Sequence, residues 1–129
     1  MKCFFFILMI PFMALSQDIR QSESYANGRV VYEDFCKLCH MTNGKGVPKA
    51  FPPLANSDYL EDIKATVKSI KYGLSGPIVV NGIKYNSVMA PMGLDDQEVA
   101  DVANYILNTW GNSYDELITR QMVQKLTAK

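Results

Sequence analysis

The sequence has no excess of charge of either sign. Its 13 Lys and Arg are balanced by 13 Asp and Glu, and the formal net charge is +0. Nucleic-acid binding depends on clustered basic residues that neutralise phosphates, so this composition excludes nucleic acid as a partner. Internal repeats and low-complexity tracts are absent as well. With 129 residues, 48% of them hydrophobic, the chain is expected to form one globular domain.

A hydrophobic run long enough to span a membrane is also missing. The apolar run from Cys3 to Leu15 follows Lys2 and is shorter than the roughly 20 residues that a transmembrane helix needs. It ends in small residues of the kind that a signal peptidase reads. We therefore expect residues 1–16 to be a cleaved signal peptide, with an uncleaved membrane anchor as the alternative. Cleavage would remove Lys2 and leave a net charge of −1.

Cysteine and histidine are scarce, with three Cys and one His in the chain. Cys3 lies in the expected signal peptide, which leaves Cys36 and Cys39. A disulfide between cysteines three positions apart closes almost no loop and adds little stability. A zinc site would need more Cys or His ligands than the chain offers. A thioredoxin-like dithiol would need a βα context, whereas this pair lies between a helix and a loop.

The two cysteines belong to the motif Cys36-Lys37-Leu38-Cys39-His40. C-x-x-C-H is the attachment motif of c-type haem, in which both thiols add across the vinyl groups and the histidine ligates the iron. One helical turn places the two sulfurs at the edge of the ring and the imidazole under its centre. A simple pair of buried cysteines would leave the single histidine unexplained. The motif therefore predicts covalent haem attachment.

The rest of the chain predicts helices joined by loops, with almost no sheet. Two segments have the acidic start and glycine end of an amphipathic helix. The first has Asp58, Glu61 and Gly73, and the second has Asp95, Glu98 and Gly111. An Asn-Gly dipeptide predicts a two-residue hairpin turn. The expected elements are a loose segment at 17–27, a short helix at 28–38, a loop at 41–57, a helix at 58–74, a hairpin at 78–85, a helix at 95–110 and a short helix at 119–126.

These features together resemble the class I (mitochondrial-type) cytochromes c, especially small bacterial monohaem members. The matching segments are Gly28-x-x-x-Tyr32-x-x-x-Cys36, CKLCH at 36–40, NGKGVPKAFPPLANSDYL at 43–60, GLSGPIVVNGIKYNSVMAP at 73–91 and VANYILNTWGN at 102–112. The resemblance implies an all-α class I cytochrome c fold, with three to four helices around one covalently bound haem c and a small hairpin before a Met loop. The expected divisions are a signal peptide at 1–16, a loose segment at 17–27, a haem domain at 28–112 and a C-terminal helical extension at 113–129.

The sequence offers two candidates for the sixth iron ligand and two for the hydrogen-bond acceptor of the proximal histidine. Met89 or Met92 could supply a thioether, a soft neutral donor that raises the reduction potential. Pro52 or Pro53 could offer a carbonyl to the Nδ1–H of His40. The resemblance favours Met89, because the family's ligand precedes a proline, and it favours Pro52.

Other positions are expected to support the haem site. Gly28 has no side chain, so another helix can cross it closely. The resemblance implies that this helix is the one carrying Val102 and Tyr105. Three residues are candidates for contact with the haem propionates, and the sequence does not choose among them: Tyr85, Asn86 and Trp110.

The resemblance implies a monomeric periplasmic electron carrier rather than an enzyme. Its redox protein partners would be a dehydrogenase or quinol-oxidising complex as donor and a terminal oxidase or reductase as acceptor. A haem peroxidase remains an alternative, but it needs an open iron site and a distal acid or base. A ligand sensor or a subunit of a larger oxidoreductase also remains. Lysines without acids at 36–57 and 63–94 predict a positive face around the haem edge.

Overall fold

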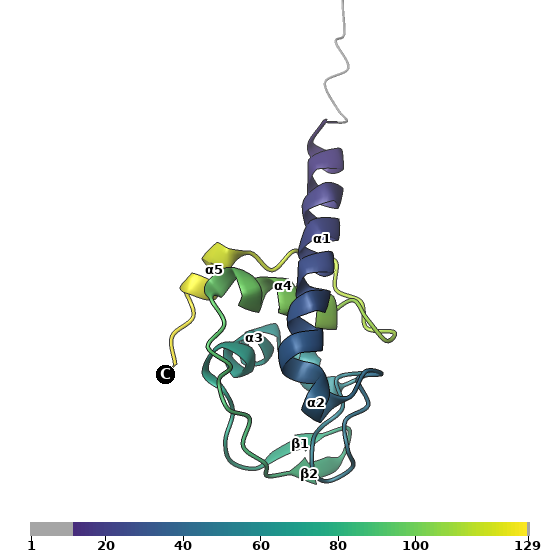
Figure 1. Cartoon of the computed structure of the whole chain (residues 1–129), viewed down its shortest axis with the longest axis vertical. Helices are drawn as coiled ribbons and strands as arrows, with labels where there is room; N and C mark the ends of the chain where they lie inside the picture. The colour runs from purple at the N-terminus through teal and green to yellow at the C-terminus, as the bar shows by residue number, and fades with distance from the viewer. Residues whose placement is uncertain (1–11, 129) are drawn as a thin grey trace, which may run out of the picture.

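The computed structural model describes residues 12–128, so most of the expected signal peptide lies outside the described residues. Over this range the chain is mostly helical, with one two-stranded hairpin (Figure 1), which confirms the predicted fold class. The helices are α1 (Phe12–Val31), α2 (Lys37–His40), α3 (Ile63–Tyr72), α4 (Asp96–Ile106) and α5 (Arg120–Gln124). None of the helices in this range is both long and apolar enough to cross a membrane.

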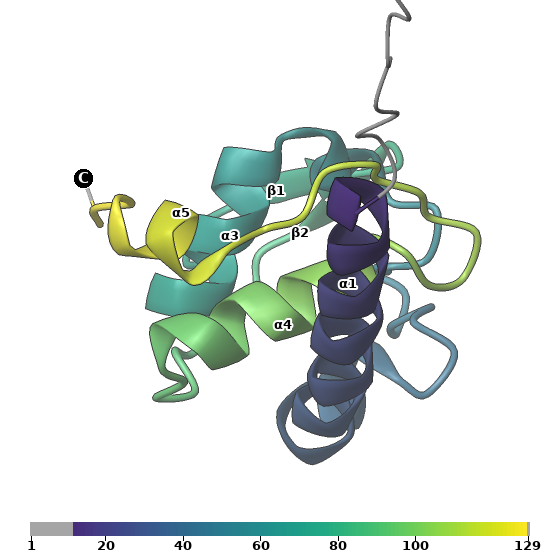
Figure 2. The same ribbon diagram turned by 90° about the horizontal axis from the view of Figure 1, so that it is seen from above.

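Helix α1 runs without a break from Phe12 to Val31, so the prediction of a loose segment at 17–27 is wrong. Its buried positions include Ser24 and Gly28, which are too small or too polar to reveal a hydrophobic period. This face packs against α4, and the two helices cross steeply (Figure 2). Tertiary packing therefore stabilises a helix that its own composition does not predict.

The crossing of α1 and α4 depends on Gly28, as predicted. A Cβ atom at Gly28 would overlap the carbonyl oxygen of Asp101 and would lie 2.9 Å from the Cβ of Tyr105. Real Cβ atoms do not approach other heavy atoms so closely, and any side chain would push the helices apart. The glycine thus allows the backbones of α1 and α4 to touch.

The CKLCH segment follows α1 through one π-helical turn, η1 (Tyr32–Cys36), which leads into the short helix α2. A π turn places one extra residue in the helical ladder, so it rotates the residues that follow relative to α1. The predicted helix at 28–38 is therefore present as three joined pieces. A long loop at 41–57 follows, as expected, and holds only the isolated bridge between Val47 and Phe51.

The helix expected at 58–74 is split in two. Residues Asp58–Glu61 form a single 3₁₀ turn, η2, and α3 begins only at Ile63. Its N-cap is Asp62, whose side chain accepts a hydrogen bond from the Ala65 N–H at 2.9 Å, so the prediction that the helix starts at Asp58 and Glu61 is wrong. Asp58 instead accepts a hydrogen bond from the Asn81 N–H at 2.8 Å, across to the hairpin. Gly73 ends α3 with φ 77°, as expected.

The hairpin consists of β1 (Ile78–Val80) and β2 (Ile83–Tyr85), paired antiparallel with Val80 opposite Ile83. Asn81 and Gly82 form its turn with φ 49° and φ 78°. Positive φ at both positions is the geometry that the Asn-Gly pair predicts. The hairpin and its turn are therefore confirmed.

Helix α4 begins at the predicted acids Asp95 and Glu98, which form a capping box. The Asp95 side chain accepts from the Glu98 N–H, and the Glu98 carboxylate accepts from the Asp95 N–H. The helix ends at Ile106, before Gly111, because the side chains of Asn108 and Thr109 donate hydrogen bonds to carbonyl groups of the last turn. Trp110 then takes φ 55° and leaves the helical path.

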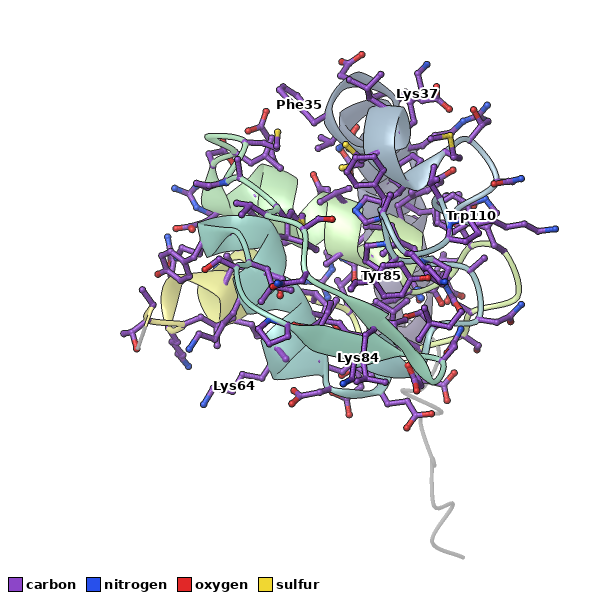
Figure 3. The ribbon with its side chains drawn as sticks, turned by 90° about the horizontal axis from the view of Figure 1, so that it is seen from below. Phe35, Lys37, Lys64, Lys84, Tyr85 and Trp110 are labelled. Atoms are coloured by element: carbon purple, nitrogen blue, oxygen red, sulfur yellow. The ribbon has the colours of Figure 1, made fainter. Side chains whose placement is uncertain are left out.

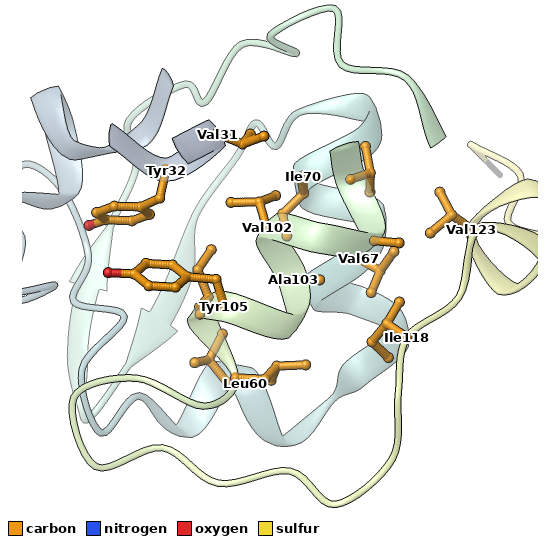
Figure 4. Close-up of a cluster of buried hydrophobic side chains, with 14 residues drawn as sticks. Val31, Tyr32, Leu60, Val67, Ile70, Val102, Ala103, Tyr105, Ile118 and Val123 are labelled. Atoms are coloured by element: carbon orange, nitrogen blue, oxygen red, sulfur yellow. The ribbon is translucent and has the colours of Figure 1, made fainter. Parts of the chain in front are cut away.

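The hydrophobic core lies where α1, α3, α4 and the C-terminal segment meet (Figure 4). Residues 113–128 contribute Ile118 and Val123, both almost fully buried. The buried Asn104 of α4 holds this segment in place, since its amide donates to the Ile118 carbonyl and accepts from the Ile118 N–H, both at 2.9 Å. Helix α5 confirms the short helix expected near 119–126.

Candidate functional site

The two cysteines of the CKLCH motif are free thiols, and both are partly exposed. Burial, and to a smaller extent the neighbouring Cys39, raises the pKa of Cys36 to about 11. Catalytic and redox-active dithiols depend on a lowered cysteine pKa. The environment of Cys36 therefore opposes the redox-dithiol interpretation of the motif.

His40 is buried and its ring orientation is fixed. Its Nδ1–H donates to the carbonyl of Pro52 at 2.9 Å, the residue that the family resemblance favoured over Pro53. Burial lowers the pKa of His40, and the bond to Pro52 opposes this only in part. A neutral imidazole that donates from Nδ1 keeps its lone pair on Nε2, which is the form that ligates a metal.

The backbone directly after His40 is strained. Met41 has φ 65° and ψ 161°, a region that is almost restricted to glycine and costs other residues about 1–3 kcal/mol. The carbonyl of Met41 accepts a hydrogen bond from the Tyr32 hydroxyl at 2.6 Å and one from the Gly44 N–H at 3.1 Å. Burial raises the pKa of Tyr32 well above its ordinary value, so its hydroxyl remains a donor.

Two adjoining cavities open beside His40, between α2, the 41–57 loop, α3 and the segment after the hairpin. The inner one holds about 700 Å³ of empty space and the outer one about 840 Å³, counted to their open mouths. Both are lined by Cys36, His40, Pro52, Leu74, Ile78 and two methionines, Met89 and Met92. Cys39 joins the lining at the outer cavity. Among the described residues, no charged side chain lines either cavity.

Met89 is held in place by its backbone. It pairs with Leu74 in an isolated antiparallel bridge, with both N–H···O hydrogen bonds at 2.8 Å. Gly73 allows this approach, because a Cβ there would meet the Met89 carbonyl oxygen. Met92 also lines the cavities, but it is 41% exposed and outside the bridge. The fixed backbone favours Met89 as the ligand among the two methionines.

The three candidates for contact with the haem propionates lie in different places. Tyr85 is buried and lines the outer cavity, whereas Asn86 lines neither. Trp110 packs on Gly44, and its indole N–H donates to the Thr42 carbonyl at 3.2 Å. Trp110 therefore supports the 41–57 loop and lines neither cavity.

Sequence reasoning missed a polar group on the wall of the inner cavity. Tyr59 donates to the Ser69 hydroxyl at 2.9 Å, and Ser69 donates in turn to the Ala65 carbonyl at 2.8 Å. Thr66 lies one turn away and also lines this cavity. The signal was present in the sequence, since Thr66 and Ser69 fall on the face of α3 that carries the buried Val67 and Ile70.

The arrangement fits a haem group. The cavities are lined mostly by apolar side chains, as cofactor sites usually are. They bring one neutral imidazole, two thioethers and two thiols to the same space. Nitrogen and thioether donors together with attached thiols are the set that c-type haem requires. A large flat apolar ring would also bury the side chains that face this space.

Comparison with known proteins agrees with this fit. The family model for cytochrome c matches residues 25–110. Cytochrome c-552 of Thermus thermophilus is 39% identical over 116 residues, which cover 81% of this chain and 86% of that protein.

Larger redox enzymes also contain similar segments. The cytochrome c subunit of the alcohol dehydrogenase (quinone) of Gluconobacter oxydans is 32% identical over 124 residues, which cover 87% of this chain and 26% of that subunit. The gluconate 2-dehydrogenase cytochrome c subunit of Pantoea cypripedii is 32% identical over 103 residues, covering 77% of this chain and 23% of that subunit. The chain thus spans about a quarter of the length of these two subunits. It belongs to the cytochrome c family, whose members are electron-transfer proteins that bind haem c covalently.

Proposed function

We propose that this chain is an exported electron carrier with one haem c, attached through Cys36 and Cys39 and ligated by His40 and Met89. When bound, the haem supplies one-electron chemistry by alternating between ferric and ferrous iron. The observation that carries the proposal is the shared lining of the two cavities. His40, Met89 and Cys36 face the same apolar space although Met89 is distant in the sequence from the CKLCH motif.

The protein's own residues have definable tasks in this proposal. Pro52 fixes the tautomer and the plane of the His40 ring through the hydrogen bond at 2.9 Å and makes the imidazole a better donor. The bridge to Leu74 fixes the backbone of Met89 beside the same space. Within residues 12–128, no charged side chain lines the cavities, so the lining disfavours the ferric state, which carries the extra positive charge. Neutral lining and a thioether ligand both raise the reduction potential.

The face around the cavity mouth suits transient docking. Phe35, Val88 and Met92 line the outer cavity and are exposed, which gives the mouth an apolar rim. Figure 3 shows Lys37 near Phe35 at one end of the molecule and Lys84 on the hairpin at the other. Apolar contact with a basic periphery favours an acidic partner and fast dissociation.

Two lysines contribute less to this face than the sequence predicted. Lys37 forms a salt bridge with Glu33 at 2.6 Å. Lys71 forms one with Asp96 at 2.9 Å and also donates to the Val123 carbonyl. The other lysines at 36–57 and 63–94 form no salt bridge within residues 12–128; Lys45, Lys49, Lys64 and Lys84 are exposed, and Lys68 is partly exposed.

We place the carrier in the periplasm on the strength of the expected signal peptide, and we expect it to be a monomer. A dehydrogenase or quinol-oxidising complex would reduce it, and a terminal oxidase or reductase would oxidise it.

The second candidate function is that of a cytochrome subunit of a dehydrogenase, and the similar segments in two dehydrogenase cytochrome subunits favour it. Light scattering separates these two functions, since a free carrier has the mass of one chain and a subunit associates with its dehydrogenase.

Ligand binding to the reduced protein tests the proposed iron coordination. With both His40 and Met89 on the iron, the reduced protein should not bind CO at neutral pH. The oxidised protein should bind cyanide slowly and show no peroxidase turnover. Rapid CO or cyanide binding, or peroxidase turnover, would indicate an open iron site and would favour a sensor or an enzyme instead.

A further inference from the structure

Tyr32 makes a contact that packing alone does not require. It is fully buried, and its ring packs edge-on against Trp110 with centroids 5.0 Å apart and tilted against Tyr105 at 5.4 Å. A phenylalanine ring would fill the same space. The hydroxyl, however, reaches nine residues along the chain to the Met41 carbonyl at 2.6 Å. The aromatic cluster therefore fixes a donor at the strained residue that follows His40.

The Met41 turn determines how the chain leaves the haem motif. Met41 donates its N–H to the Lys37 carbonyl at 2.9 Å, which closes α2. The His40 carbonyl accepts from the Gly46 N–H at 3.0 Å, so the chain folds back immediately. This return brings Pro52 against the His40 ring. The backbone around Met41 thus links the hydroxyl of Tyr32 to the hydrogen bond on His40 Nδ1.

We propose that Tyr32 is a positioning residue for the proximal ligand: its hydroxyl holds the strained Met41 turn and so keeps His40 in hydrogen-bonding register with Pro52. The inference rests on the proposed role of His40 as an iron ligand. Without the hydroxyl, Met41 relaxes toward an ordinary conformation, because only its surroundings stabilise the strained one. The bond from His40 to Pro52 then opens more often, and the imidazole becomes a weaker donor.

The test uses the holoprotein in its reduced, diamagnetic state. Tyr32→Phe keeps the ring and removes the hydroxyl. We expect the Nδ1 proton of His40 to exchange with solvent about fivefold faster, the change in an equilibrium constant that the loss of one hydrogen bond of about 1 kcal/mol produces. We also expect a higher reduction potential, since a weaker histidine donor stabilises ferric iron less.

The matched control is Tyr25→Phe. Tyr25 belongs to the same aromatic cluster, with its ring 5.1 Å from Tyr105, but its hydroxyl is hydrogen-bonded to the Thr109 hydroxyl at 3.2 Å and not to the Met41 turn. This variant loses one hydrogen bond without touching Met41, so exchange at His40 and the potential should stay at wild-type values. A purely structural role for Tyr32 would lower the unfolding free energy and leave both readouts unchanged, which would overturn the proposal.

A double variant tests the link through Met41. Glycine adopts the Met41 backbone angles without strain, so Tyr32→Phe should have a smaller effect when combined with Met41→Gly. If Tyr32→Phe alone yields no holoprotein, the double variant should restore it. Equal effects in both backgrounds, or no restoration, would contradict the proposal. A wild-type protein that lacks histidine ligation would instead refute the proposed function, so the two failures are distinguishable.

Discussion

Substitution of Gly28 by alanine is a direct test of the helix crossing that supports the haem motif. The added Cβ would overlap the Asp101 carbonyl oxygen and lie 2.5 Å from the carbonyl carbon. Carbon atoms rest about 3.5 Å apart, so α1 and α4 must separate by about 1 Å, and a gap of that size removes up to about half of the dispersion energy of the contacts. Because the obstacle is backbone, no change of rotamer can relieve it.

The expected cost follows from two opposing terms. Overpacking costs about 1–3 kcal/mol and sometimes more, and a backbone obstacle belongs at the upper end of that range. Alanine regains about 1 kcal/mol of helix propensity over glycine. We therefore expect Gly28→Ala to lower the free energy of unfolding by about 2–4 kcal/mol, measured by guanidinium titration of the holoprotein.

The neighbouring position provides the control for helix propensity. Asn27 is exposed, so Asn27→Ala should gain up to about 0.7 kcal/mol from propensity without a steric cost. The two substitutions are therefore expected to have opposite signs. If Gly28→Ala were neutral or stabilising like Asn27→Ala, α1 would not cross α4 at Gly28 and the account of the fold would be wrong.

Four further predictions concern the iron ligand, docking, the cap of α4 and the C-terminal segment. Met89→Ala should abolish the near-infrared iron–sulfur band of the oxidised protein and lower its reduction potential, while Met92→Ala should do neither; exchanged outcomes would make Met92 the ligand. Electron-transfer rates with the partner should fall as ionic strength rises, because charge steering is screened within about 8–10 Å, and a flat profile would indicate apolar docking alone. Asp95→Ala should lower the unfolding free energy by about 1 kcal/mol in urea titrations, and an unchanged midpoint would mean that the capping box adds no stability. Asn104→Ala removes both hydrogen bonds to Ile118 and should make residues 113–119 sensitive to limited proteolysis, whereas unaltered resistance would show that apolar packing alone holds the segment.

The features that the sequence predicted correctly depend on short stretches of chain. The hairpin follows from an Asn-Gly pair, because few other residues accept two positive φ angles in succession. The start of α4 follows from two acids three positions apart that satisfy each other's backbone N–H groups. The partner of His40 was assigned by resemblance rather than by physics, and the hydrogen bond to Pro52 is present.

The features that the sequence did not predict depend on distant contacts. Helix α1 buries Ser24, whose hydroxyl donates to the buried Asp101 at 2.6 Å, and this polar contact 77 positions away has no local signature. Helix α3 starts later than predicted because the Asp58 carboxylate accepts a hydrogen bond from the hairpin and does not cap the helix. The strained Met41 could not be foreseen, since its conformation exists only because Tyr32 and Gly44 hold it.

Covalent haem attachment is the central claim, and intact mass spectrometry after acid denaturation tests it most directly. The chain should be expressed with haem c maturation so that Cys36 and Cys39 can react. Thioether bonds survive acid, so the account predicts a single species with the mass of residues 17–129 plus one haem. A species at the mass of the bare polypeptide, with haem released into solution, would contradict it.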